Sequence, residues 1–164
     1  MSGIPTTTDY GGRQVDLELL QSVTTPSGEQ QVHLTSVGNN AKIVSGIEKA
    51  IQRYAVLLLS TIEDIHFAPE QGGELISGLT TGRIHNLGYL YHVFGMVNGN
   101  TLMLLARDDD AGIYGAVPDD ERVTGAELVS AALDASTRTI NLTVRLATAA
   151  GSNFTFVVPI NTME

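Results

Sequence analysis

The spacing of polar and apolar side chains near the start of the chain predicts a short β-hairpin. Residues 14–19 alternate polar and apolar side chains, and residues 31–35 do so again. The turn residues Pro-Ser-Gly lie between them, at 26–28. Residues 1–12 are rich in Thr and Gly and have no period of either kind, so we expect a flexible N-terminal arm.

A change of period at residue 45 predicts an α-helix that runs to about residue 60. Apolar side chains now recur at three- and four-residue spacing, at Ile47, Ile51, Tyr54 and Leu58. Ser45 and Glu48 have the spacing of a capping box at the start of this helix.

The middle of the chain has a mixed pattern. Pro69 and the Gly72-Gly73 pair interrupt the chain, and residues 75–79 have the composition of another short helix. Apolar positions between residues 83 and 111 suggest a further helix, although Gly88 and Gly95 each disfavour it by about 1 kcal/mol relative to Ala. Asn-Gly-Asn at 98–100 predicts a turn, and residues 101–107 fit a buried strand or a helical turn equally well.

The last third of the chain predicts three antiparallel strands, near 127–133, 139–147 and 154–160, joined by turn-forming segments. In the second strand, apolar residues occupy one face and polar residues the other, which is typical of a half-buried strand. The expected fold class is therefore α+β: a capped α-helix packed on an antiparallel β-meander, with the N-terminal hairpin and arm attached.

Composition limits the classes of partner. The 164 residues, 43% of them hydrophobic, suit one domain, which we place at residues 13–164. No apolar run approaches the roughly 18 residues of a membrane span, and a net charge of -9 repels nucleic acid. The absence of cysteine excludes disulfides and thiolate sites, and the first residues lack the pattern of a secretory signal. We expect neither a nucleic acid nor a membrane as a partner.

Candidate chemistry is sparse, so we expect no cofactor, no metal and no catalytic residue. The four histidines (His33, His66, His85, His92) lack the i, i+4 spacing of a helical metal site. Asp108-Asp-Asp110 does not fit a calcium loop, and an acidic loop facing water is expected there. Glu63, Asp64, Glu70 and Glu74 would supply a hydrolytic carboxylate pair only if they shared a cleft, which keeps a glycan hydrolase as one alternative function.

Two motifs resemble the sheath-initiator family of contractile phage baseplates and type VI secretion wedges. The first is a helix ending in Leu-Leu-Leu-Ser-Thr at 57–61, followed at the family's spacing by Asp64, Pro69, Gly72 and Leu75. The second stands before the closing strands, where the family has Glu-Pro-Arg and a hydrophobic residue and this chain has Asp120, Glu121, Arg122 and Val123. Glu121 replaces the proline of that motif. Asp120 and Arg122 have the chemistry of a charge-assisted pair, which would hold the meander on the helical part if it were partly buried.

The resemblance implies a structural protein of the virion that nucleates the tail sheath and is assembled in the host cytoplasm. In multiple copies around the tail axis, it would join baseplate wedge and hub or tube proteins to the first ring of tail sheath protein by strand addition between chains. Pro159 suggests that the last strand lies near an edge. The expected docking strands contain Leu142, Val144, Phe154, Phe156 and Val158. A head-tail connector or tube-end adaptor is the second alternative function.

Overall fold

The fold was obtained as a computed structural model, which describes residues 16–24, 30–34, 43–60, 73–112, 115–134 and 139–161. The helices of this part are α1 (Ile47–Leu59), α2 (Leu75–Thr80) and α3 (Leu87–Asp110). Its strands are β1 (Asp16–Leu17), β2 (Leu20–Thr24), β3 (Gln30–Leu34), β4 (Ile43–Val44), β5 (Val123–Asp134), β6 (Thr139–Thr148) and β7 (Asn153–Asn161). The chain is thus an α+β protein with an antiparallel meander, as predicted. The expected arm, residues 1–12, lies outside the described residues.

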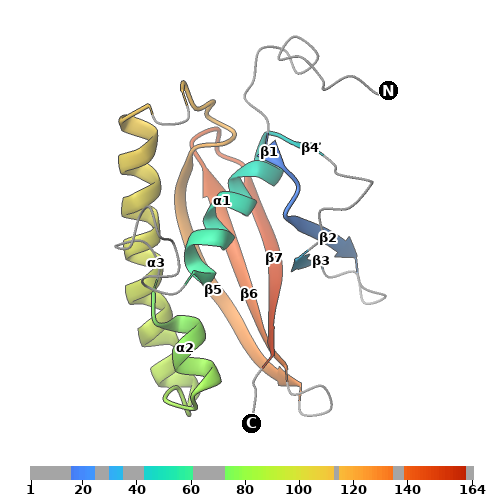
Figure 1. The fold of residues 1–164 in the computed structure, drawn as a ribbon, viewed down its shortest axis with the longest axis vertical. Coiled ribbons are helices and arrows are strands. Elements are labelled where there is room, and N and C mark those ends of the chain that lie inside the picture. The colour runs from blue at the N-terminus through green and yellow to red at the C-terminus, as the bar shows by residue number, and fades with distance from the viewer. Residues whose placement is uncertain are drawn as a thin grey trace.

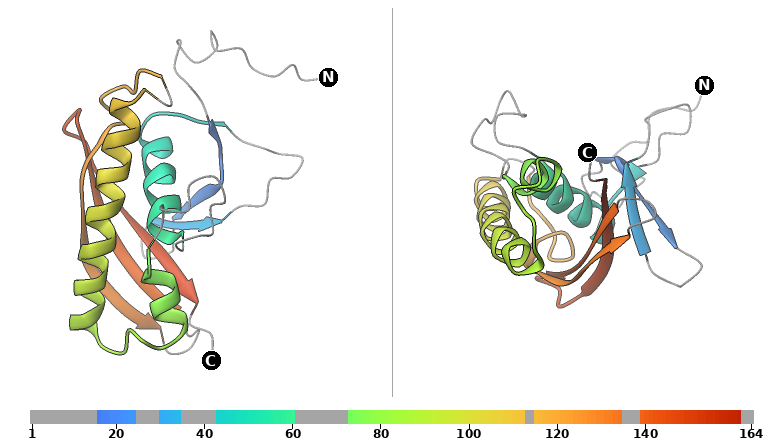
Figure 2. Two further views of the ribbon diagram at one scale, coloured as in Figure 1. Left: turned by 60° about the vertical axis from the view of Figure 1, so that its left-hand side comes forward. Right: turned by 90° about the horizontal axis from the view of Figure 1, so that it is seen from below.

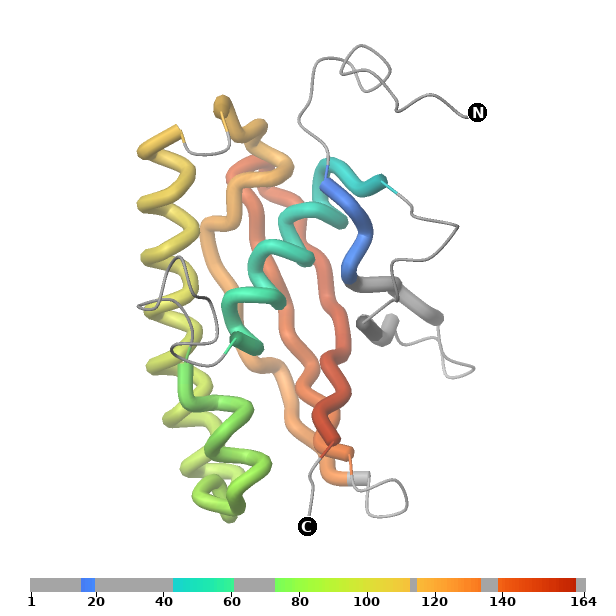
Figure 3. Tube along the Cα trace, in the orientation of Figure 1, coloured from blue at the N-terminus to red at the C-terminus, as the bar shows by residue number. Residues whose placement is uncertain are grey.

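One sheet supports the fold, with helices on one of its faces. Its strand order is β2-β3-β7-β6-β5, antiparallel except for the parallel pair β3 and β7, while β1 and β4 form a separate pair. Figures 1 and 2 show the three helices on the same face of the meander, with α3 beside β5. Figure 3 shows α1 crossing the meander at an angle.

The meander forms at the predicted positions because its middle strand has one apolar face. Leu142, Val144 and Leu146 are buried on β6, whereas Arg145 between them is exposed. β5 begins four residues earlier than expected, at Val123, and two register shifts interrupt its pairing with β6.

The N-terminal hairpin also forms, but its first strand is later than predicted. β2 pairs with β3 over residues 20–24 and 30–34, whereas the alternation of residues 14–19 predicted the earlier segment. Part of that segment, β1, instead pairs with β4 and is held on α1 by Gln52. The Gln52 amide donates to Asp16 at 3.1 Å and to the Leu17 carbonyl at 2.8 Å. These contacts explain why the alternating pattern does not form one hairpin strand.

α1 confirms the predicted helix, but its predicted capping box is wrong. The cap residue is Gly46, with φ of 63°, which has no side chain to form the predicted cap hydrogen bond. A positive φ is costly for Ser and nearly free for Gly, which places the helix start one residue after Ser45. The apolar face of α1 packs on the meander, where Tyr54 and Phe156 meet edge to face at a centroid distance of 6.4 Å.

α3 is one continuous helix of 24 residues, so the turn predicted at 98–100 is wrong. The side chain of Asn86 caps the start by accepting from the Tyr89 N–H at 2.8 Å. Asn98 lies in mid-helix because it connects three elements: it accepts from the Tyr54 hydroxyl at 2.8 Å and donates to the Ala126 carbonyl at 2.9 Å. Tertiary contacts therefore override the local turn preference.

Candidate docking surface

Glu121 is the buried member of the second motif. Its side chain is 1% exposed, its Oε1 accepts from the Gly46 N–H at 2.9 Å, and its Oε2 lies 3.0 Å from the Lys49 ammonium. Both partners belong to the start of α1, although 75 positions separate Gly46 from Glu121. The carboxylate takes the place of the predicted capping box, because the first N–H groups of a helix lack partners within the helix and favour negative charge.

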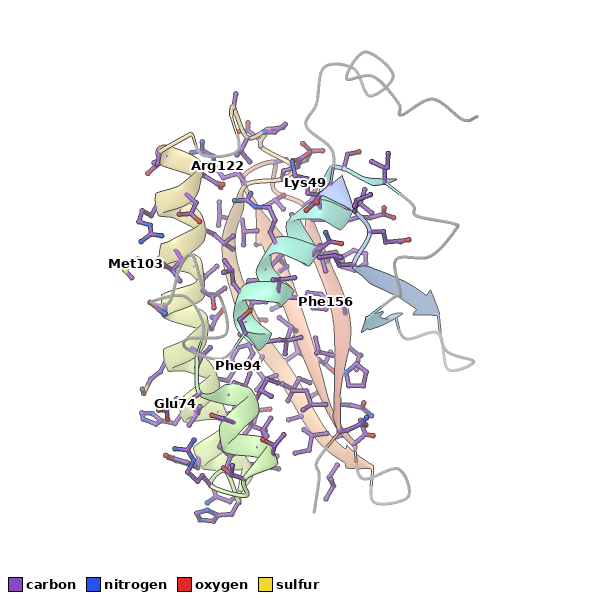
Figure 4. All side chains as sticks on the ribbon, in the orientation of Figure 1. Lys49, Glu74, Phe94, Met103, Arg122 and Phe156 are labelled. Atoms are coloured by element: carbon purple, nitrogen blue, oxygen red, sulfur yellow. The ribbon has the colours of Figure 1, made fainter. Side chains whose placement is uncertain are left out.

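The segment before β5 is also bound to the turn between β6 and β7. The N–H of Ala149 donates to the Arg122 carbonyl at 2.9 Å, and that of Ala150 donates to the Asp119 carbonyl at 3.0 Å. Figure 4 places Lys49 and Arg122 at this same end of the molecule. The motif therefore joins the start of α1, the start of β5 and the meander turn.

Arg122 lies close to the end of α3. Its Nη1 lies 3.7 Å from Oδ1 of Asp110, at the end of α3, and both side chains are well exposed. An exposed pair of this kind contributes about 0 to 1 kcal/mol. The buried ion pair between this motif and the helical part is the one between Glu121 and Lys49.

The remaining motif residues divide between the core and the undescribed part. Val123 and Leu75 are buried in the core, at the starts of β5 and α2. Asp64, Pro69 and Gly72 lie outside the described residues.

Four of the five predicted docking residues have buried side chains. Leu142, Val144, Phe156 and Val158 belong to the core between the sheet and the helices, and Phe154 is partly buried against it. The last strand is an inner strand of the sheet: β7 pairs with β6 along its length and with β3 at one pair of residues, Gln31 and Val157. These side chains stabilise the domain and offer no surface to a partner.

The edge of the meander is β5. Within the described residues the sheet ends in β2 and β5, and β5 pairs only with β6, so β5 is the edge of the meander. Asn98 of α3 donates to the Ala126 carbonyl near the start of this strand at 2.9 Å. Val129 and Leu133 are the large apolar side chains exposed on it, at 49% and 66%. One of the two register shifts lies at Val129, between Leu128 and Ser130. Sequence alternation alone did not show which of the three strands would be outermost.

The expected acidic loop is instead the last turn of α3. Asp109 is buried with Arg53, whose Nη2 lies 2.6 Å from its Oδ1, and Asp108 is buried beside Arg107 at 3.1 Å. Only Asp110 of the three is exposed. Helix periodicity brings two of these aspartates onto the inner face, where arginines neutralise them.

The described residues contain no cluster of three or more His or acidic side chains suited to a metal ion. His85 and His92 are exposed and stack on either side of Tyr89. Of the four carboxylates considered for hydrolysis, Glu74 is described, and it is exposed beside Arg83. None of the described helices has both the length and the apolar character of a membrane span.

Comparisons with known proteins give no relative. No family model matches the chain, and neither a curated protein nor a solved structure is significantly similar to it.

Proposed function

We propose that this chain is a structural subunit of a contractile-tail baseplate that starts sheath assembly. It would join baseplate wedge and hub or tube proteins to the first ring of tail sheath protein, in several copies around the tail axis. The proposal combines the two sequence motifs with one structural observation, the open side of β5.

The open strand supports docking by strand addition. An edge strand carries N–H and C=O groups without a ladder partner, and an added strand from another chain satisfies them. Asn98 already binds the Ala126 carbonyl, so the added strand would pair with the part of β5 that follows, where the exposed Val129 and Leu133 would give it apolar contacts. The docking strand is thus β5, in place of the buried strands that the sequence suggested.

The second motif suits this role because it fixes where β5 begins. Glu121 immediately precedes the strand region and is bonded to the start of α1, while Arg122 and Asp119 are bonded to the meander turn. A force applied to β5 would pass directly into the helices and the meander. This rigid connection is what a subunit between a baseplate and a contracting sheath requires.

The test places lysines on the edge. In Val129→Lys/Leu133→Lys, both changes are at exposed side chains, so the fold should survive, while two buried charges would oppose docking. Thr155→Lys, an exposed position on β7, is the control. We expect tails assembled with the double variant to have baseplates without sheath, and control tails to have normal sheath, as seen by electron microscopy.

Full-length sheath on tails that contain the folded double variant would exclude β5 as the docking strand. The alternatives give different results. A glycan hydrolase would release fragments from peptidoglycan, and a connector or tube-end adaptor would occupy the other end of the tail in a reconstruction of the particle.

A further inference from the structure

The outer side of α3 is an uncharged helix surface that has no partner in the described structure. No Asp, Glu, Lys or Arg occurs from residue 87 to residue 106. Among the exposed residues of α3, seven lie on one line with alternating spacings of three and four, and we call them the outer stripe: Tyr89, His92, Met96, Gly99, Met103, Ala106 and Asp110. Leu87, Tyr91, Gly95 and Arg107 are exposed beside it. Met96 and Met103 are 63% and 62% exposed, and Figure 4 shows Met103 on the side of α3 away from the sheet. Exposed apolar side chains at this spacing are typical of a helix that packs on another helix.

Within the part of the chain that the structure describes, packing does not require glycine at positions 95 and 99. A Cβ added at Gly95 or Gly99 would meet no atom within 4 Å, and neither residue has a positive φ. Glycine is nevertheless among the least favourable residues inside a helix. A helix approaching closely at these two positions would use the space that they leave.

We propose that a second copy of this chain covers the outer stripe, with the two α3 helices antiparallel. The midpoint of the stripe lies between Gly99 and Asn100, so an antiparallel copy would place Met96 opposite Met103 twice. Each Met103 would then rest in the recess left by Gly95 and Gly99 of the other copy. A two-fold axis requires such self-complementarity.

Charge selects the antiparallel arrangement. Asp110 ends the stripe at the negative end of the helix dipole, and its side chain is 76% exposed although Arg122 lies 3.7 Å away. A parallel pair would bring the two Asp110 side chains together in a protein that already carries a net charge of -9. The antiparallel pair places each Asp110 near Tyr89 and His92 of the other copy, whose hydroxyl and ring N–H donate hydrogen bonds.

The size of the surface predicts a weak dimer. A helix of 24 residues is about 36 Å long, and one face of it covers less than the roughly 800 Å² per partner of a standard interface. Dissociation constants in the micromolar range are expected. This inference does not depend on the proposed function, since purified protein alone tests it.

The first experiment measures the mass of the full chain by light scattering and sedimentation, up to about 1 mM. We expect a concentration-dependent shift from 17.4 kDa towards twice that mass. Met103→Glu should weaken the dimer at least tenfold. The control Leu17→Glu, which adds the same charge at an exposed leucine of β1, should leave it unchanged. Gly99→Ala should raise the melting temperature of the monomer while weakening the dimer. If Gly99 served only the fold of the monomer, the substitution would not have these two opposite effects.

The second experiment tests the orientation with cysteines, which the natural chain lacks. In the antiparallel dimer, a mixture of Met96→Cys and Met103→Cys chains should form the mixed disulfide. Neither variant alone should cross-link, because the same residue in the two copies would lie about 10 Å apart along the helix axis, beyond the reach of a disulfide. A monomer at all concentrations, a dimer insensitive to Met103→Glu, or cross-linking of each variant only with itself would overturn the proposal. A monomer would leave the stripe to a helix of a different protein.

Discussion

Removing the Glu121 carboxylate should be among the most damaging single changes in this protein. The side chain is 1% exposed and has two partners at the start of α1, the Gly46 N–H and the Lys49 ammonium. In Glu121→Ala, Lys49 loses this counter-charge in a buried position and Gly46 loses its acceptor. Breaking a buried ion pair from one side reduces stability by about 3 to 5 kcal/mol. That is a large part of the roughly 5 to 15 kcal/mol that stabilise a domain.

The size of the effect should depend on which part of the interaction is kept. Glu121→Gln keeps an acceptor for the Gly46 N–H but loses the charge, so we expect a loss of about 2 kcal/mol, within the range for hydrogen bonds to charged groups. The double change Lys49→Met/Glu121→Leu removes both charges and keeps apolar volume. It should therefore be more stable than Glu121→Ala, because replacing a buried pair is far less costly than breaking it.

The assay is urea unfolding of all three variants and the wild type, followed by far-ultraviolet circular dichroism. The free energy of unfolding is compared only where the slope m is unchanged, since a changed slope indicates a different unfolded or folded state. Arg122→Ala is the matched control, because its exposed pair with Asp110 should contribute less than about 1 kcal/mol. If Glu121→Ala unfolds within 1 kcal/mol of the wild type, or no more easily than Arg122→Ala, the reasoning about this motif is wrong.

Three further changes test the packing of the helices. Asn98→Ala should lower stability by about 2 to 3 kcal/mol, because both the Tyr54 hydroxyl and the Ala126 carbonyl lose their hydrogen bond to Asn98. Tyr54→Phe removes one of these two hydrogen bonds and should lower stability by about 1 kcal/mol. Equal losses of the two variants in urea unfolding would contradict this. Burial raises the pKa of the Tyr54 hydroxyl above its ordinary value of 10.0. The contribution of the neutral hydroxyl to stability is therefore complete below pH 10 and is lost as the pH rises further. The free energy of unfolding should fall less steeply above pH 10 in Tyr54→Phe than in the wild type, and identical pH profiles would argue against this. Gly73→Ala should lower the melting temperature by several degrees, since its Cβ would lie 2.6 Å from Cγ1 of Val97, and an unchanged melting curve would show that Val97 moves aside easily.

The sequence by itself determined the elements with a strong local period. α1 was predictable because its apolar residues repeat at helical spacing, and β6 because apolar and polar residues alternate along it. Both patterns reflect burial of one side of the element, which each segment carries in its own residues. The sequence also singled out residues 120–123, but it did not indicate that Glu121 forms a buried ion pair with Lys49.

Only the tertiary structure decided the contacts between distant parts of the chain. Glu121 caps α1 across 75 positions, and Asn98 is helical because it bridges Tyr54 and β5. Because β3 pairs with β7, β5 is the outer strand of the meander and β2 is the other end of the described sheet. No local pattern encodes these choices, because an alternating strand has the same sequence whether it lies at the edge or the centre of a sheet. Strand order depends on which backbone edges remain free once the helices and the hairpin have packed, and that is a property of the whole fold.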